Sequence, residues 1–156
     1  MGYMAVKLDI SKAYDRVEWG FLRKIMLKMG FDSRWVHLAK ETIITASYLV
    51  LINGEPRGFI TPSRGIRQGY PISPYLFLLC AEGLSAMLRK AEESHNMRGI
   101  KSSQHGVCIS HLLFADDNLL FCCATVEECQ QLLNLLGVYE ATSGQAINRQ
   151  KNFIVF

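Results

Sequence analysis

The sequence lacks the features that would place it in a membrane or in an oxidising compartment. None of its apolar runs approaches the roughly 20 residues that a bilayer-spanning helix needs, and its first residues lack the basic, apolar and small-residue zones of a signal peptide. The five cysteines include no C-x-x-C pair and the four histidines lie far apart, which argues against a zinc module or a disulfide scaffold. We therefore expect an intracellular, reducing compartment, nucleus or cytoplasm, and no membrane partner.

A strong charge of one sign is also absent. The 156 residues include 17 lysines and arginines against 14 aspartates and glutamates, and the net charge of +3 is compatible with a polyanionic partner without demonstrating one. Apolar side chains are plentiful, at 49% of the residues, which is enough for the packed core of one domain. Because no internal repeat or linker is evident, we expect one domain over residues 1–156.

Hydrophobic periodicity and turn residues predict an α+β fold with a largely antiparallel sheet. Asn53 and Gly54 stand between two apolar segments and are a strong hairpin signal. Strands are expected at residues 5–10, 47–52, 58–61, 99–102, 107–114 and 153–156. Helices are expected at residues 15–30, from about 33 to 44, from 73 to the polar connection near 92, and from 125 to about 139.

Helix starts are predicted from side chains that can accept a hydrogen bond from the first helical turn. The three candidates are Asp15 with Glu18, Ser73 before Pro74, and Thr125 with Glu128. The helix that starts near residue 33 is expected to carry Trp35, Leu38, Ile43 and Ile44.

The most distinctive segment is residues 111–121 (HLLFADDNLLF), in which two adjacent carboxylates stand between two short apolar arms. This pattern predicts a β-hairpin with Asp116 and Asp117 at its tip. Neighbouring carboxylates repel each other and neither arm supplies a cation, which favours a divalent metal ion at this turn. Asp9 lies in an apolar strand, where a charge is costly unless it is paired or bound to metal. The alternative is an acid at the exposed end of a strand.

Three sequence blocks together resemble a reverse transcriptase palm. They are residues 7–15 (KLDISKAYD), 65–77 (GIRQGYPISPYLF) and 114–117 (FADD), in the order that the family has. The whole chain is most similar to the reverse transcriptase domain of LINE-type (non-LTR) retrotransposons, especially those of plants. The resemblance implies an antiparallel palm sheet packed with helices, in a truncated piece of a transposable element.

The resemblance also implies a nucleotidyltransferase, an RNA-directed DNA polymerase that extends a DNA primer on an RNA template with dNTPs. Two magnesium ions (Mg²⁺) would activate the primer 3′-hydroxyl and hold the triphosphate. By resemblance Asp9 and Asp116 are the main metal ligands, Asp117 is less direct, and the backbone carbonyl of Ile10 is a further ligand. The alternative is that these acids are ordinary surface residues without metal.

Other positions correspond to the nucleotide and template site of the family. Tyr14 matches an aromatic residue that would clash with a ribose 2′-hydroxyl, or is a core aromatic. Asp15 is better explained as a helix cap than as a metal ligand. Gln68 and Gly69 match the step beside the nascent base pair, where glycine lets the backbone approach the nucleotide. Arg67 either pairs with phosphate or is a solvated loop arginine.

Two further positions bear on activity. Tyr70 stands where LINE-type enzymes usually have aspartate, between this glycine and a proline. Lys151, in residues 143–151 (SGQAINRQK), matches a lysine that protonates the leaving pyrophosphate, or is a solvent-facing side chain. The resemblance places fingers, thumb and endonuclease segments outside these 156 residues. The alternative to a polymerase is therefore a catalytically silent remnant that acts as a nucleic-acid-binding or structural module.

Overall fold

The protein is described by a computed structural model, which covers the backbone of residues 2–101, 103, 106–114, 117–148 and 153–155. Side chains are described for these residues except 153–155. The main sheet has the order β6-β7-β1-β8, with β9 also paired to β1, and every pair is antiparallel. Its strands are β1 (Tyr3–Ser11), β6 (His111–Phe114), β7 (Asp117–Cys123), β8 (Ala146–Ile147) and β9 (Phe153–Val155).

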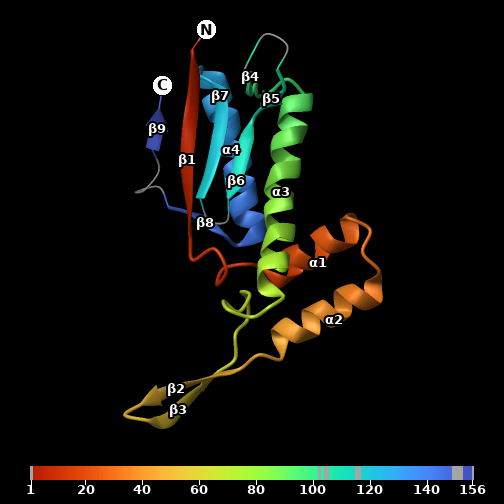
Figure 1. Ribbon diagram of the computed structural model, residues 1–156, viewed down its shortest axis with the longest axis vertical. Helices are drawn as coiled ribbons and strands as arrows, with labels where there is room; N and C mark the ends of the chain where they lie inside the picture. The colour runs from red at the N-terminus through yellow and green to blue at the C-terminus, as the bar shows by residue number, and fades with distance from the viewer. Residues whose placement is uncertain (1, 102, 104–105, 115–116, 149–152, 156) are drawn as a thin grey trace.

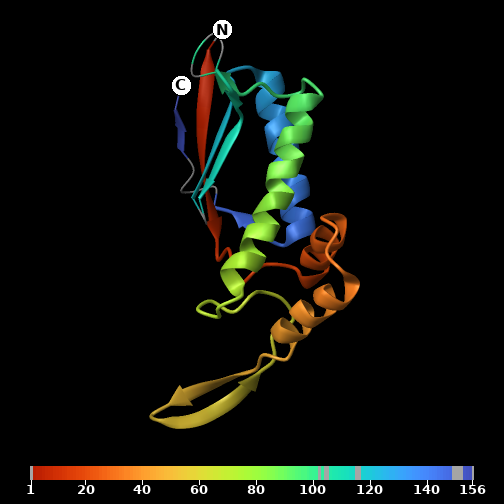
Figure 2. The same cartoon turned by 45° about the vertical axis from the view of Figure 1, so that its right-hand side comes forward.

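Two long helices, α3 (Ser73–Glu93) and α4 (Val126–Ser143), lie against one face of this sheet (Figure 1 and Figure 2). Two shorter helices, α1 (Trp19–Lys28) and α2 (Ser33–Ile44), lie beyond one end of the sheet (Figure 1). Among the described residues no helix lies on the opposite face of the sheet (Figure 2). The predicted α+β class with an antiparallel sheet is confirmed.

Strand β1 shows why one face is open. Its residues alternate strictly, with Met4, Val6, Leu8 and Ile10 buried, because successive side chains of a strand point to opposite faces. Lys7 and Asp9 therefore lie on the face away from the helices. The polar residues of β1 are thus placed on the open face of the sheet.

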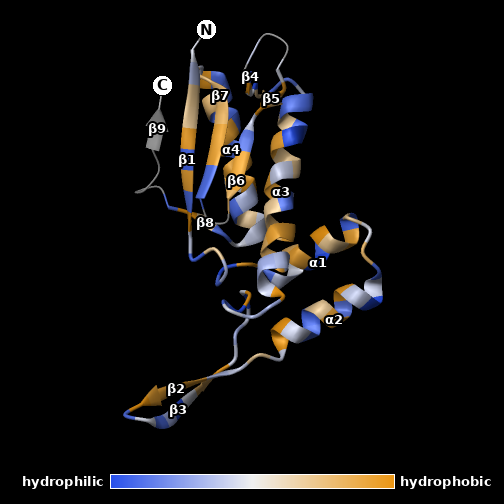
Figure 3. Ribbon diagram, viewed as in Figure 1, coloured by the Kyte–Doolittle hydropathy of each residue, from blue (hydrophilic) through white to orange (hydrophobic). Residues whose placement is uncertain are grey.

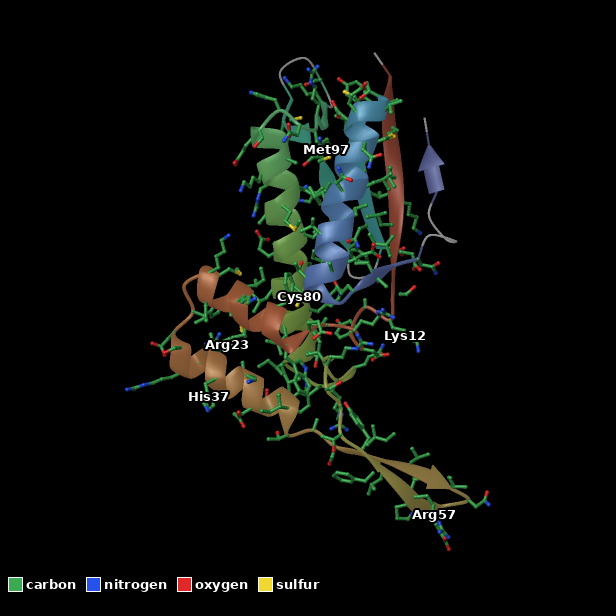
Figure 4. The ribbon with its side chains drawn as sticks, turned by 180° about the vertical axis from the view of Figure 1, so that it is seen from behind. Lys12, Arg23, His37, Arg57, Cys80 and Met97 are labelled. Carbon is green, nitrogen blue, oxygen red and sulfur yellow. The ribbon has the colours of Figure 1, made fainter. Side chains whose placement is uncertain are left out.

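The apolar side chains form two clusters. One lies between the sheet and the two long helices and includes Leu8, Leu84, Leu120 and Tyr139. The other lies where the start of α3 meets α1 and α2, around Leu22, Leu76 and Cys80. Figure 4 shows Cys80 at the junction of these helices. Within the described part of the chain, no helix is long and apolar enough to span a membrane.

A hairpin of β2 (Tyr48–Ile52) and β3 (Glu55–Ile60) projects from this body (Figure 1). Its turn has positive φ at Asn53 (53°) and Gly54 (82°), the geometry of the tight turn that the sequence predicts. The labelled Arg57 in Figure 4 lies out on this hairpin, away from the sheet. The predicted hairpin is confirmed, with a second strand that begins earlier than expected. A further two-stranded ladder joins β4 (Ile100–Lys101) and β5 (Cys108–Ile109).

Two predicted helix starts are wrong. Helix α1 begins at Trp19 and its N-cap residue Glu18 makes no side-chain cap bond, so Asp15 is not its cap. The reason is tertiary, because residues 12–18 are held by distant segments: the Glu18 N–H donates to the Ser143 carbonyl at 2.8 Å. Helix α3 has Ile72 as its N-cap residue, and Ser73 lies inside the first turn.

The remaining helix predictions hold in part. Thr125 caps α4, and its Oγ1 accepts a hydrogen bond from the Glu128 N–H at 3.3 Å, as predicted. Helix α2 buries Val36, Ala39 and Ile43 and is capped by Asp32. Helix α2 carries the four residues expected of it, of which Trp35 and Leu38 are 41% and 64% exposed.

Candidate functional site

The two carboxylates that the structure describes near the predicted metal site face each other across the sheet. Asp9 of β1 is the register partner of Asp117 of β7. Directly opposed residues of an antiparallel pair point to the same face with Cβ atoms about 4.5–5.5 Å apart, here the open face. The predicted meeting of Asp9 with the acidic hairpin is thus observed for Asp117, while Asp116 lies outside the described residues.

A lysine from β1 partly balances this pair of acids. The Lys7 Nζ lies 3.0 Å from the Asp117 Oδ1, and both side chains are about half exposed. Lys7 precedes Asp9 by two residues and therefore shares its face. Sequence reasoning considered only the two arms of the acidic hairpin and missed this cation on the neighbouring strand. Because the ion pair is solvent-exposed, its contribution to stability is about 0–1 kcal/mol.

Asp9 is held by an asparagine that follows β8. The Asn148 Nδ2 donates to the Asp9 Oδ2 at 3.0 Å, and the Asn148 backbone N–H donates to the Asp9 carbonyl at 2.8 Å. Both residues are half-buried. Sequence reasoning missed Asn148 because the two residues are 139 positions apart and no local pattern links them.

The turn after β1 and the loop before α3 line a shared hollow. Its volume is about 180 Å³ and its lining includes Ile10, Lys12, Tyr14 and Gln68. The Tyr14 ring stacks on Phe77 of α3, with a centroid distance of 4.6 Å and an interplanar angle of 12°. Tyr14 is therefore a packed aromatic and also lines the hollow. The structure brings together two predicted nucleotide-site residues, Tyr14 and Gln68.

A second and larger cavity lies between α2, the base of the projecting hairpin and the loop at 61–72. It measures about 570 Å³ and is lined by Tyr48, Arg67, Gln68 and Tyr70, among others. The Arg67 guanidinium stands over the Tyr48 ring at 5.8 Å from its centroid. Gly69 has a φ of +83°, a left-handed conformation that favours glycine.

Another glycine of this loop, Gly65, is more constrained. A Cβ at Gly65 would stand 2.6 Å from the Asp15 carbonyl oxygen, and its φ is +91°. The Gly65 N–H donates to the Val17 carbonyl at 2.8 Å, and the Gly65 carbonyl accepts from the Trp19 Nε1 at 2.7 Å. These contacts hold the loop against the turn that carries Tyr14.

A buried polar network, which the sequence did not reveal, contacts the turn that carries Tyr14 from the side of α4. Gln145 is buried, and its Nε2 donates to the Ala13 carbonyl at 2.9 Å. The Tyr139 hydroxyl of α4 donates to the Gln145 Oε1. Burial raises the pKa of Tyr139, so its hydroxyl stays protonated. The network fixes residues 13–15 relative to α4.

Three further titratable side chains, His111, Cys80 and Cys122, are packed in the body of the fold away from the acids. The His111 Nε2 and Nδ1 lie 2.8 and 2.9 Å from the hydroxyls of Ser85 and Ser110, and burial lowers the pKa of His111. Burial raises the pKa of Cys80 and Cys122 to about 12, so neither thiol is ionised at neutral pH. Among the described residues, which omit Asp116, no group of three His, Cys, Asp or Glu side chains could hold a metal ion. Lys151 also lies outside the described residues.

Known proteins resemble this chain in sequence. It is 56% identical over 69 residues to an uncharacterized mitochondrial protein of Arabidopsis thaliana. It is 30% identical over 152 residues to the transposon TX1 uncharacterized 149 kDa protein of Xenopus laevis. It is 28% identical over 149 residues to the Pol polyprotein of the type-1 retrotransposable element R2 of Popillia japonica. These matches cover 44%, 94% and 96% of this chain, which spans 57%, 11% and 23% of the three relatives.

Solved structures share the fold. A telomerase from Candida albicans, in complex with a fragment of telomeric RNA, matches all of this chain and 28% of its own with a TM-score of 0.73 and 14% identity. An apo telomerase from Candida tropicalis matches 99% of this chain and 31% of its own with a TM-score of 0.72 and 15% identity.

The family model described as reverse transcriptase (RNA-dependent DNA polymerase) matches residues 2–156. The relatives from R2 and TX1 confirm the resemblance to non-LTR retrotransposons, and the Arabidopsis protein fits its plant-like character. The chain belongs to the reverse transcriptase family.

Proposed function

We propose that residues 1–156 are the palm part of an RNA-directed DNA polymerase and carry its nucleotidyl-transfer centre. The observation that supports this most directly is the opposition of Asp9 and Asp117 on the open face of the sheet. Like charges directly across a sheet destabilise the pairing of the strands. A site that binds a divalent cation would explain why two carboxylates occupy opposed positions, because the cation would offset their repulsion.

The donor set fits magnesium. Mg²⁺ prefers a few carboxylate oxygens together with water and phosphate oxygens, and Asp9 and Asp117 offer carboxylates on one face. We assign Asp9, Asp116, Asp117 and the Ile10 backbone carbonyl as the groups that would hold two ions. When bound, such ions lower the pKa of the primer 3′-hydroxyl and neutralise the charge that develops on the triphosphate.

The chain's own residues would bind and orient the nucleotide. Phe77 stacks on the Tyr14 ring and fixes its position at the edge of the 180 Å³ hollow. A ring held there would exclude a ribose 2′-hydroxyl and so favour dNTPs over ribonucleotides. Gln68 lines the same hollow, and with Gly69 it would lie beside the nascent base pair.

Two basic residues complete the assignment. The exposed Arg67 guanidinium stands over Tyr48 and would pair with phosphate, since its planar donors match two phosphate oxygens. Lys151 would donate a proton to the leaving pyrophosphate. The RNA template, the DNA primer and dNTP are the partners in this proposal. The chain spans only 11% and 23% of the TX1 and R2 relatives. We therefore also propose a longer parent protein that supplies the fingers, thumb and endonuclease segments.

Primer extension tests the proposal. The 156-residue chain is incubated with an RNA template, a DNA primer, dNTPs and Mg²⁺, and Asp9→Asn and Asp116→Asn should each abolish any extension that it supports. Asp32→Asn is the matched control, because Asp32 caps α2 far from the sheet and asparagine caps equally well. Extension retained in Asp116→Asn would contradict the metal assignment. Because Tyr70 replaces the usual aspartate, extension by Tyr70→Asp but not by the wild-type chain would favour the silent remnant.

A further inference from the structure

We infer that Asn148 is a positioning residue for Asp9: its side-chain amide fixes the orientation of the carboxylate toward the metal that the proposed function requires. The inference rests on that proposed function and adds a residue that neither the acidic hairpin nor the strand of Asp9 contains. It starts from two hydrogen bonds that join the same two residues.

The pair of hydrogen bonds leaves little freedom to either partner. The backbone bond from the Asn148 N–H to the Asp9 carbonyl, at 2.8 Å, fixes the distance between the two chain segments. The side-chain bond from the Asn148 Nδ2 to the Asp9 Oδ2, at 3.0 Å, then fixes the carboxylate itself. Because one carboxylate oxygen is bound to a donor of known position, the orientation of the carboxylate is set before any ion arrives.

The segment that carries Asn148 is itself anchored. Strand β8 pairs with Ile10 and Ser11 at the end of β1. The Ile147 N–H donates to the Glu140 Oε1 at 2.7 Å, and buried Gln145 joins the Tyr139 hydroxyl to the Ala13 carbonyl. Asn148 is therefore held by α4 and β1 together, as a positioning residue must be.

The chemistry of the donor also suits the role. An amide is neutral, so its hydrogen bond orients the carboxylate without adding a positive charge beside it. A cationic donor, such as the Lys7 ammonium that pairs with Asp117, instead adds a charge that opposes a metal ion.

The test measures metal binding directly. Mn²⁺ is titrated into the 156-residue chain and free Mn²⁺ is followed by its paramagnetic resonance signal, with the melting temperature recorded for each variant. Asn148→Leu keeps the size of the side chain and the backbone bond but removes the amide. Partners of metal-bound groups typically contribute about 10- to 100-fold in metal affinity, so we expect the dissociation constant to rise at least about tenfold. Asn134→Leu, the same substitution at an exposed position of α4, should leave it unchanged.

A readout without metal checks the hydrogen bond itself. In the metal-free wild-type chain, the side-chain amide protons of Asn148 should exchange with solvent more slowly than those of exposed Asn134. Asn148→Leu could lower the melting temperature and leave the Mn²⁺ dissociation constant unchanged. That result would mean that Asn148 is merely structural, and it would overturn this inference without contradicting the proposed function. If the folded wild-type chain binds no Mn²⁺, the metal centre of the proposed function fails, and the inference that rests on it fails too.

Discussion

The pair of β1 and β7, which carries Asp9, and the hairpin of β2 and β3 are both antiparallel, but they are supported in different ways. Strand β1 pairs with β7, β8 and β9 and buries every second residue against helices. Among the described residues the hairpin pairs only with itself, although Figure 3 shows hydrophobic colour along β2. All but one of its strand residues are exposed, including Leu51 at 69% and Phe59 at 70%. The comparison shows that a local turn can define a strand pair, whereas a site needs tertiary packing to hold it.

The largest expected effect comes from truncating a leucine in each of the two regions, which tests how much tertiary packing each region has. Leu120→Ala removes a fully buried leucine of β7 and should destabilise the fold by about 2–5 kcal/mol, because it leaves a cavity. Leu51→Ala removes an exposed leucine of β2 and should change stability by no more than about 0.5 kcal/mol. Urea unfolding followed by circular dichroism measures both. Equal losses would mean that the hairpin is packed as tightly as the sheet.

A pair of glycine substitutions makes the same comparison at the backbone. In Gly54→Ala the new Cβ in the hairpin turn meets open space. The expected loss of stability is therefore only the cost of a left-handed backbone conformation for alanine, about 1–2 kcal/mol. Gly65→Ala bears the same cost and also drives a Cβ to 2.6 Å from the Asp15 carbonyl oxygen, so we expect a distinctly larger loss. Thermal unfolding of the two variants gives the difference. A Gly65→Ala chain as stable as Gly54→Ala would show that the turn can move away at little cost.

A third prediction concerns the Tyr14 ring at the supported end of the sheet. Tyr14→Ala should increase ribonucleotide incorporation in a primer-extension assay, since the ring that would exclude the 2′-hydroxyl is gone. The variant should also lose about 0.5–1.5 kcal/mol of stacking with Phe77. Phe59→Ala, which removes an exposed ring from the hairpin, is the control. Unchanged discrimination between ribonucleotides and dNTPs in Tyr14→Ala would contradict the gate role.

The smallest expected effect depends on pH. Burial lowers the pKa of His111 below its ordinary value of 6.5, so the unfolded chain binds the proton more readily than the folded one. The resulting stability is present above about pH 6.5 and is lost as the pH falls through the folded pKa. Urea unfolding between pH 5 and 7 should show this slope, and His111→Gln should reduce it. His37→Gln, at a largely exposed position of α2, should leave it unaltered.

Local signals in the sequence predicted the parts of the fold that depend on neighbouring residues. The turn at Asn53 and the cap at Thr125 are such cases, because their hydrogen bonds or dihedral angles involve residues a few positions apart. The cap expected at Asp15 was wrong, because hydrogen bonds from distant segments decide where α1 begins.

The proximity of the two described acids was predicted to the extent that they belong to recognisable blocks, while their role as metal ligands stays a prediction. The meeting of Asp9 with Asp117 follows from the family resemblance and is observed in the register of the sheet. The groups that support the acids were not predicted. Lys7, Gln145 and Asn148 reach their partners through strand order and helix packing, and no local pattern in a single sequence encodes such distances.

The strand order also governs when the site can form during synthesis. Strand β1 leaves the ribosome before its partners, and Asp9 meets Asp117 and Asn148 only after those residues have been added, the latter 139 positions later. Contacts of such long sequence separation form late and slowly. The carboxylate of Asp9 therefore gains its neighbours only when the nascent chain has passed residue 148. A product released before residue 148 would carry Asp9 without the asparagine that orients its carboxylate.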